Sequence, residues 1–102
     1  MKIITEKEFD NEVKEGIVLV DFFATWCGPC RMMGMTLEEI EKEVGDKVKI
    51  VKVDVDEDEG LARRFGIMSI PTLLLYVDGK VYEKHVGLWQ KDTLVELINS
   101  FK

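Results

Sequence analysis

An almost continuous apolar run, Ile17–Phe23, restricts the possible folds of this chain more than any other stretch. Only one acid, Asp21, interrupts it. A strand with one face in water alternates apolar and polar residues, whereas a strand covered on both faces stays apolar throughout. We therefore expect a central strand with helices packed on both sides of its sheet.

Segments of strand and helix pattern alternate on either side of this run. Further strands are expected at residues 2–4, 47–54, 72–77 and 80–86, and helices at 5–16, 30–44, 58–65 and 90–101. Such alternation favours parallel pairing early in the chain. Asp78-Gly79, between the last two strands, is a two-residue turn signal that makes them an antiparallel hairpin. The sequence predicts one α/β domain over residues 1–102, with a mixed five-stranded sheet flanked by helices on both faces.

Boundary signals mark the first two expected helices. Thr5 followed by Glu8 has the form of a capping box, which places a helix start there. Gly16 and Gly45 are expected to end the first and second helices.

The second expected helix contains a cluster of methionines. Met32 and Met33 fit the apolar spacing set by Leu37, Ile40 and Val44, so both are expected to face the core. An exposed, adaptable methionine surface is the alternative interpretation. We favour core packing.

Composition and charge narrow the possible functions. The formal net charge of −6 argues against binding to nucleic acids or to anionic membrane surfaces. No apolar run approaches the roughly 20 residues of a membrane span, and the first residues are too poor in apolar side chains for a signal peptide. We therefore expect a cytoplasmic protein, in whose reducing surroundings a cysteine pair is more often catalytic than structural.

The two cysteines, Cys27 and Cys30, enclose Gly28-Pro29 where the second helix begins. Residues three apart share a helix face, so the sulfurs can form and release a disulfide. The positive end of the helix dipole should lower the pKa of Cys27 below about 8.5. We expect Cys27 to be an exposed attacking thiolate and Cys30 a shielded resolving thiol. Pro29 suits the first helical turn, and Gly28 removes bulk beside the attacking sulfur.

Other interpretations of these residues need comparison. A zinc site normally has four ligands, but the chain adds only His85 to its two cysteines, so we predict no metal site. A static disulfide closing so short a loop would constrain the unfolded chain little. Asp21 is either a base for Cys30 or a structurally paired acid, and the residues alone leave both open. The acidic run at 54–59 lacks a calcium-loop pattern and is interpreted as a solvated loop and helix start.

The run Trp26–Cys30 resembles the active site of the thioredoxin family. Further matches follow in the family's order and spacing over nearly the whole chain: Asp21-Phe22, Lys52–Asp56, Phe65–Ile67, Ile70–Leu75, Asp78-Gly79 and Val86-Gly87. The resemblance implies the thioredoxin fold. It also implies a thiol–disulfide oxidoreductase that reduces protein disulfides through a mixed disulfide, with a redox-active Cys27–Cys30 disulfide and no bound cofactor.

The resemblance assigns further roles. It implies that Asp21 is buried behind Cys30 as its base, with Lys52 close to Asp21. It also implies a cis Ile70–Pro71 bond facing the cysteines, although an average proline is cis in only about 6% of cases. The backbone of Ile70 would then pair with an extended substrate segment.

A shallow apolar substrate groove is also implied by the resemblance. Its expected residues are Trp26, Gly28, Pro29, Gly66, Ile67, Ile70, Pro71, Gly87 and Leu88. Met35 stands where the family often has a helix-bending proline, so we expect an unbroken second helix.

The expected partners are disulfide-containing proteins and an electron donor of the thioredoxin-reductase type. We expect a monomer, and the resemblance implies that Gly28-Pro29 favours a reductant over an oxidant. The alternatives are a pathway-specific electron carrier, a disulfide isomerase and a non-enzymatic binding subunit that uses the same fold.

Overall fold

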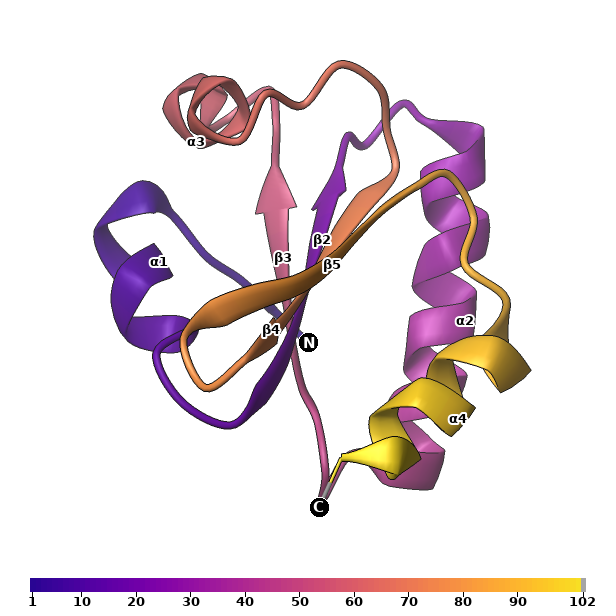
Figure 1. Ribbon diagram of the computed structural model, residues 1–102. Coiled ribbons are helices and arrows are strands. Elements are labelled where there is room, and N and C mark those ends of the chain that lie inside the picture. Colours follow the sequence, from indigo (N-terminus) through magenta and orange to yellow (C-terminus); the bar gives the residue numbers. More distant parts are fainter. Residues whose placement is uncertain (102) are drawn as a thin grey trace.

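A central sheet between two layers of helices makes up the computed structural model, which describes residues 1–101 (Figure 1). The strand order is β1-β3-β2-β4-β5. The strands are β1 (Lys2–Ile3), β2 (Ile17–Phe23), β3 (Lys49–Asp54), β4 (Thr72–Val77) and β5 (Lys80–Val86). β3 pairs in parallel with β1 and β2, while β4 pairs antiparallel with β2 and β5. The predicted mixed sheet is confirmed, and β2 lies at its centre.

Four helices cover the two faces of this sheet within the described residues. They are α1 (Glu6–Glu12), α2 (Gly28–Val44), α3 (Glu59–Arg64) and α4 (Lys91–Ser100). α2 and α4 lie along one face and α1 and α3 lie on the other (Figure 1). α2 runs unbroken through Met35, as expected for a helix without an internal proline. None of the helices among residues 1–101 is long and apolar enough to cross a bilayer.

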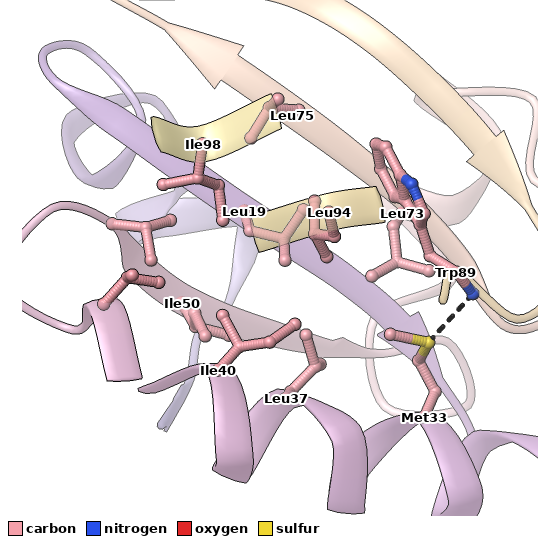
Figure 2. Packing of buried hydrophobic residues seen from close by; sticks show 12 residues of the cluster. Leu19, Met33, Leu37, Ile40, Ile50, Leu73, Leu75, Trp89, Leu94 and Ile98 are labelled. Atoms are coloured by element: carbon pink, nitrogen blue, oxygen red, sulfur yellow. Dashed lines mark hydrogen bonds between the residues drawn. The ribbon is translucent and has the colours of Figure 1, made fainter. Parts of the chain in front are cut away.

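Each face of the sheet has its own apolar core. Figure 2 shows Leu37 and Ile40 of α2 packed with Leu94 and Ile98 of α4 over the sheet. On the opposite face, α1 and α3 each bury one side chain, Phe9 and Leu61, against the other side of the strands. β2 supplies buried side chains to both cores, which explains why its sequence is apolar almost throughout.

The predicted start of α1 is confirmed, but its predicted end is wrong. The Glu8 carboxylate accepts the Thr5 N–H at 3.2 Å, as a capping box requires. The helix then stops at Glu12, before Gly16. Gly16 has a φ of 75° and exchanges hydrogen bonds with Asp78, whose carboxylate accepts its N–H at 3.0 Å. This contact with the distant β4–β5 turn draws the chain out of the helix early.

The prediction that Met32 faces the core is also wrong. Met33 is fully buried, whereas Met32 is 58% exposed and Met35 is 67% exposed. Residues four apart share a helix face, and Met33 lies four before the buried Leu37. Met32 lies instead four before Thr36, on a polar face. The exposed methionine surface therefore exists beside a single core methionine.

Strand directions determine where the functional residues meet. β4 runs antiparallel to β2, so the start of β4 lies beside the end of β2, with Thr72 opposite Phe22. β5 finishes at the same end of the sheet, where Val86 pairs with Thr72. The β4–β5 turn, at the opposite end of these strands, has positive φ at both Asp78 and Gly79, as the predicted two-residue hairpin requires. The loop from β2 to α2, the loop before β4 and the loop after β5 therefore lie at the same end of the sheet.

Candidate active site

The cysteine pair sits at the junction between the central strand and α2. Cys27 is the N-cap of the helix, and Pro29 lies in its first turn. Cys27 and Cys30 are joined by a disulfide. The Cys30 N–H donates a hydrogen bond to the Cys27 sulfur at 3.2 Å. The Cys27 sulfur therefore lies where the unpaired N–H groups and positive dipole end of a helix stabilise negative charge.

The predicted contrast in exposure between the two cysteines is absent from this oxidised state. Cys27 is 5% exposed and Cys30 is 3% exposed. The Cys27 sulfur lies 4.0 Å from the carbonyl oxygen of Ile70, whose side chain packs against the cluster that contains both cysteines. A side chain at Gly28 would meet nothing within 4 Å, so its small size is not required by the surrounding protein.

Asp21 is fully buried on β2. Alternate residues of a strand share a face, which places Asp21 between Leu19 and Phe23 on the side covered by α2. Among residues 1–101, neither carboxylate oxygen has a hydrogen-bond partner. Burial raises the pKa of Asp21 from 3.8 to about 6, and the positive charge of Lys52 opposes part of that rise. The acid is thus poised to exchange a proton near neutral pH.

Lys52 is brought to Asp21 by the pairing of β2 with β3, in which the two residues are direct partners. The Lys52 ammonium lies 4.0 Å from a carboxylate oxygen, too far for a hydrogen bond. It also lies over the Phe23 ring, 4.3 Å from the centroid. A pocket of about 320 Å³ is lined by both Lys52 and Cys30, so it connects the surroundings of the acid with those of the second cysteine.

The loop before β4 faces the disulfide. Its Ile70–Pro71 peptide bond is cis, as the resemblance implied. The Thr72 hydroxyl donates to the Ser69 carbonyl at 2.6 Å, and the Pro71 carbonyl accepts the Gly87 N–H at 2.8 Å. Within the described chain, neither backbone group of Ile70 pairs with another backbone group. The loop is therefore firmly held while the backbone next to the disulfide stays open.

The segments predicted to form the substrate groove carry exposed apolar side chains. Trp26, directly before Cys27, is 68% exposed, and its indole N–H donates to the Asp56 carboxylate at 2.7 Å. Leu88, directly after Gly87, is 47% exposed. Gly66 and Ile67 line a separate hollow of about 600 Å³ with Val55, which packs against the cysteine cluster. The predicted groove residues therefore come from four segments of the chain. Val55 lies between two of them, because it lines the hollow with Gly66 and Ile67 and also packs against the cysteine cluster.

Sequence reasoning missed the role of Asp56. It read the acidic run as a solvated loop, and the run does form a turn before α3. Within that turn the Asp54 carboxylate accepts the Asp56 N–H at 2.9 Å, which leaves the Asp56 side chain available for Trp26. The sequence around Asp56 carries no signal for this contact, because Trp26 lies 30 residues away in the chain.

No cluster of three or more metal-ligating side chains is found in residues 1–101. The sulfurs are bonded to each other, and the single histidine lies on β5.

A model of the thioredoxin family matches residues 1–100. The chain belongs to the thioredoxin family. It is 54% identical to a thioredoxin of Bacillus subtilis over 95 residues, which is 93% of this chain and 91% of the relative. It is 52% identical to a thioredoxin of Listeria monocytogenes over 101 residues, which is 99% and 98% of the two chains.

Solved structures agree with the sequence comparisons. A mutant thioredoxin from Halobacterium salinarum superposes with a TM-score of 0.87 at 36% identity, covering 98% of this chain and 88% of that one. Together with the disulfide at the start of α2, this membership makes the chain a thiol–disulfide oxidoreductase of the protein-disulfide-reductase type.

Proposed function

We propose that the chain, acting as a single domain over residues 1–102, reduces protein disulfides with Cys27 as the attacking residue and Cys30 as the resolving one. The Cys27 thiolate attacks one sulfur of a substrate disulfide. A mixed disulfide forms, and the other substrate sulfur leaves as a thiolate that takes up a proton. The Cys30 thiolate then attacks the Cys27 sulfur. The second substrate sulfur is released, two electrons have passed to the substrate, and Cys27–Cys30 is oxidised.

One observation carries this assignment. The Cys27 sulfur lies at the N-terminus of α2, accepts a backbone N–H there, and faces the open backbone of Ile70. The helix end stabilises a thiolate on Cys27, which lowers its pKa and makes it the better nucleophile at neutral pH. Cys30, inside the first turn, is placed to reach that sulfur again once a mixed disulfide has formed.

Asp21 is proposed as the base that takes the proton of Cys30. Its pKa of about 6 lets it bind and release a proton near neutral pH, unlike an ordinary aspartate. Lys52 is proposed to tune that pKa, since its charge favours the ionised carboxylate. Lys52 and Cys30 line one pocket, while Asp21 is fully buried beside Lys52.

Substrates are proposed to bind as extended segments across the disulfide. The unpaired backbone of Ile70 would add to such a segment as a neighbouring strand does, which is recognition independent of the substrate's side chains. The proposed contact residues are Trp26, Gly28, Pro29, Gly66, Ile67, Ile70, Pro71, Gly87 and Leu88. Trp26 and Leu88 supply exposed apolar surface among them, which suits the segments around a disulfide in an unfolding protein, whereas Pro71 is buried.

The proposed setting is the cytoplasm, with the protein acting as a monomer. Its proposed partners are proteins that contain disulfides and a donor of the thioredoxin-reductase type that returns two electrons to Cys27–Cys30. No bound cofactor is needed, because the dithiol itself carries the electrons.

Insulin reduction and the reduction potential of Cys27–Cys30 test this proposal together. With dithiothreitol as electron source, the protein should accelerate the reduction of insulin, and Cys27→Ser should abolish the acceleration. The potential should lie near −270 mV, the value typical of thioredoxins as a class. A potential near −180 mV would point instead to an isomerase or oxidant. Activity that survives Cys27→Ser would contradict the proposed role of Cys27.

A further inference from the structure

We propose that His85 is a positioning residue that holds the loop 87–89, and with it Leu88, in place beside Pro71 for protein substrates. The inference rests on the proposed substrate groove. In the sequence, His85 falls within the expected strand 80–86 and is considered only as a possible metal ligand. In the structure, His85 lies near the end of β5, and its side chain contacts the loop that follows. That loop carries two proposed groove residues, Gly87 and Leu88.

Three hydrogen bonds tie this loop to three different parts of the fold. The Gly87 N–H donates to the Pro71 carbonyl at 2.8 Å. The Trp89 N–H donates to the Met33 sulfur at 3.3 Å, which joins the loop to α2 one turn beyond Cys30 (Figure 2). Between these ties, the Leu88 carbonyl lies 2.9 Å from Nε2 of His85. The His85 and Met33 contacts hold the carbonyl and the N–H of the same peptide bond, next to the exposed Leu88.

The geometry makes His85 the donor in this contact. A carbonyl oxygen only accepts, so Nε2 must carry the hydrogen. The imidazole is itself held in place, because it stacks on the Trp89 ring with centroids 4.5 Å apart and planes 13° from parallel. Trp89 is only 4% exposed and belongs to the core beneath α2 and α4. The donor is thus fixed by a buried ring rather than by a mobile side chain.

The consequence concerns substrate binding and leaves the sulfur chemistry alone. Leu88 is 47% exposed and follows Gly87, whose φ of 92° turns the chain at the end of β5. The Leu88 carbonyl and the Trp89 N–H belong to one peptide unit, so without the His85 hydrogen bond this unit would lose one of its two hydrogen bonds, and the adjoining Leu88 would be held less firmly. An extended protein segment that lies along the loop would then bind less well. A small disulfide, which reaches only the sulfur, would not be affected.

Two substitutions separate the two properties of His85. His85→Phe keeps an aromatic ring for Trp89 but has no donor. His85→Gln loses the ring but keeps an N–H group at the position of Nε2. Each reduced variant is mixed with excess insulin or with the small aryl disulfide DTNB, and oxidation of Cys27–Cys30 is followed to give second-order rate constants. Thermal unfolding of each variant is measured in parallel.

His85→Phe should lower the rate constant for insulin about two- to tenfold, the equivalent of one net hydrogen bond, while the rate constant for DTNB stays unchanged. His85→Gln should restore most of the insulin rate. If His85→Phe does not fold, His85→Leu takes its place in the comparison with His85→Gln. An equal fall for both disulfides, or a lower unfolding temperature with an unchanged insulin-to-DTNB ratio, would show a purely structural role and overturn the inference.

Leu88→Ala distinguishes this inference from the proposed groove itself. Leu88 is exposed, so its truncation should leave the fold intact. If Leu88→Ala slows insulin but not DTNB while His85→Phe changes neither, the groove stands and the role of His85 is wrong. If neither variant changes the ratio, the groove assignment at this loop fails and the inference falls with it.

Discussion

Replacing Asp21 with asparagine is expected to stabilise the folded protein at neutral pH while slowing its turnover. The pKa of Asp21 is about 6 in the folded protein, against 3.8 for an ordinary aspartate. Below the lower value the acid is neutral in both states and costs nothing. As the pH rises from about 4 to about 6, the unfolded chain ionises first, so folding becomes less favourable. Above about 6 the penalty levels off at about 3 kcal/mol, at roughly 1.4 kcal/mol per factor of ten in the ionisation constant.

Urea unfolding of the oxidised proteins measures this effect directly. The free energy of unfolding of Asp21→Asn should exceed that of the parent by up to about 3 kcal/mol at about pH 7.5, and the difference should shrink towards zero near pH 3.5. Other carboxylates cancel in the comparison because both proteins contain them. Asp46→Asn, which changes an exposed acid, is the matched control and should show almost no difference at either pH.

The reasoning fails if the stability difference between Asp21→Asn and the parent does not depend on pH over this range. It also fails if the parent gains stability relative to the variant as the pH rises, because that would mean that the folded pKa is lowered. Faster resolution of mixed disulfides in Asp21→Asn would contradict the role of Asp21 as a base.

Two further predictions concern neighbouring and distant sites. Lys52→Met removes the charge that opposes the rise of the Asp21 pKa, so that pKa, measured by NMR titration, should move above about 6. An unchanged or lower pKa would refute the electrostatic effect of Lys52 on Asp21. Gly79→Ala places a side chain at a φ of 85° and 2.9 Å from the Lys14 carbonyl oxygen, so it should lower the free energy of unfolding by at least about 1–2 kcal/mol. Because the β4–β5 turn lies at the far end of β4, insulin reduction per folded molecule should stay unchanged, and a loss of that activity would show that the hairpin affects the site.

Much of the fold was predictable because its signals are local. The unbroken apolar pattern of β2, the capping box at Thr5 and the Asp78-Gly79 turn each depend on neighbouring residues alone, and each appears where expected. The end of α1 was not predictable, because Gly16 is held by hydrogen bonds to Asp78, a residue of the β4–β5 turn that is 62 positions away in the chain.

The methionine error has a different cause. Adjacent helix positions differ by about 100° in direction, so a shift of one residue moves a side chain from core to solvent. The apolar spacing alone did not distinguish Met32 from Met33, since both are large and apolar. The position of the sheet relative to α2 decides which of them is buried.

The candidate site divides in the same way. The cysteine pair and its place at a helix start followed from spacing, whereas the cis bond before Pro71 came only from the family resemblance. The contact of Asp56 with Trp26 joins residues 30 apart in the chain, so it depends on the finished fold. His85 and Leu88 are only three residues apart, and their contact depends on the turn of the chain at Gly87. No sequence pattern around these residues signals either contact.

Trapping of the mixed disulfide tests the central assignment most directly. Reduced Cys30→Ser and Cys27→Ser are each mixed with a disulfide-containing protein, quenched with acid and analysed by mass spectrometry without reductant. Cys30→Ser should accumulate a covalent adduct through Cys27, because attack survives and resolution does not. Cys27→Ser should give none. An adduct that accumulates in Cys27→Ser and is absent from Cys30→Ser would show that Cys30 attacks, and would contradict the account.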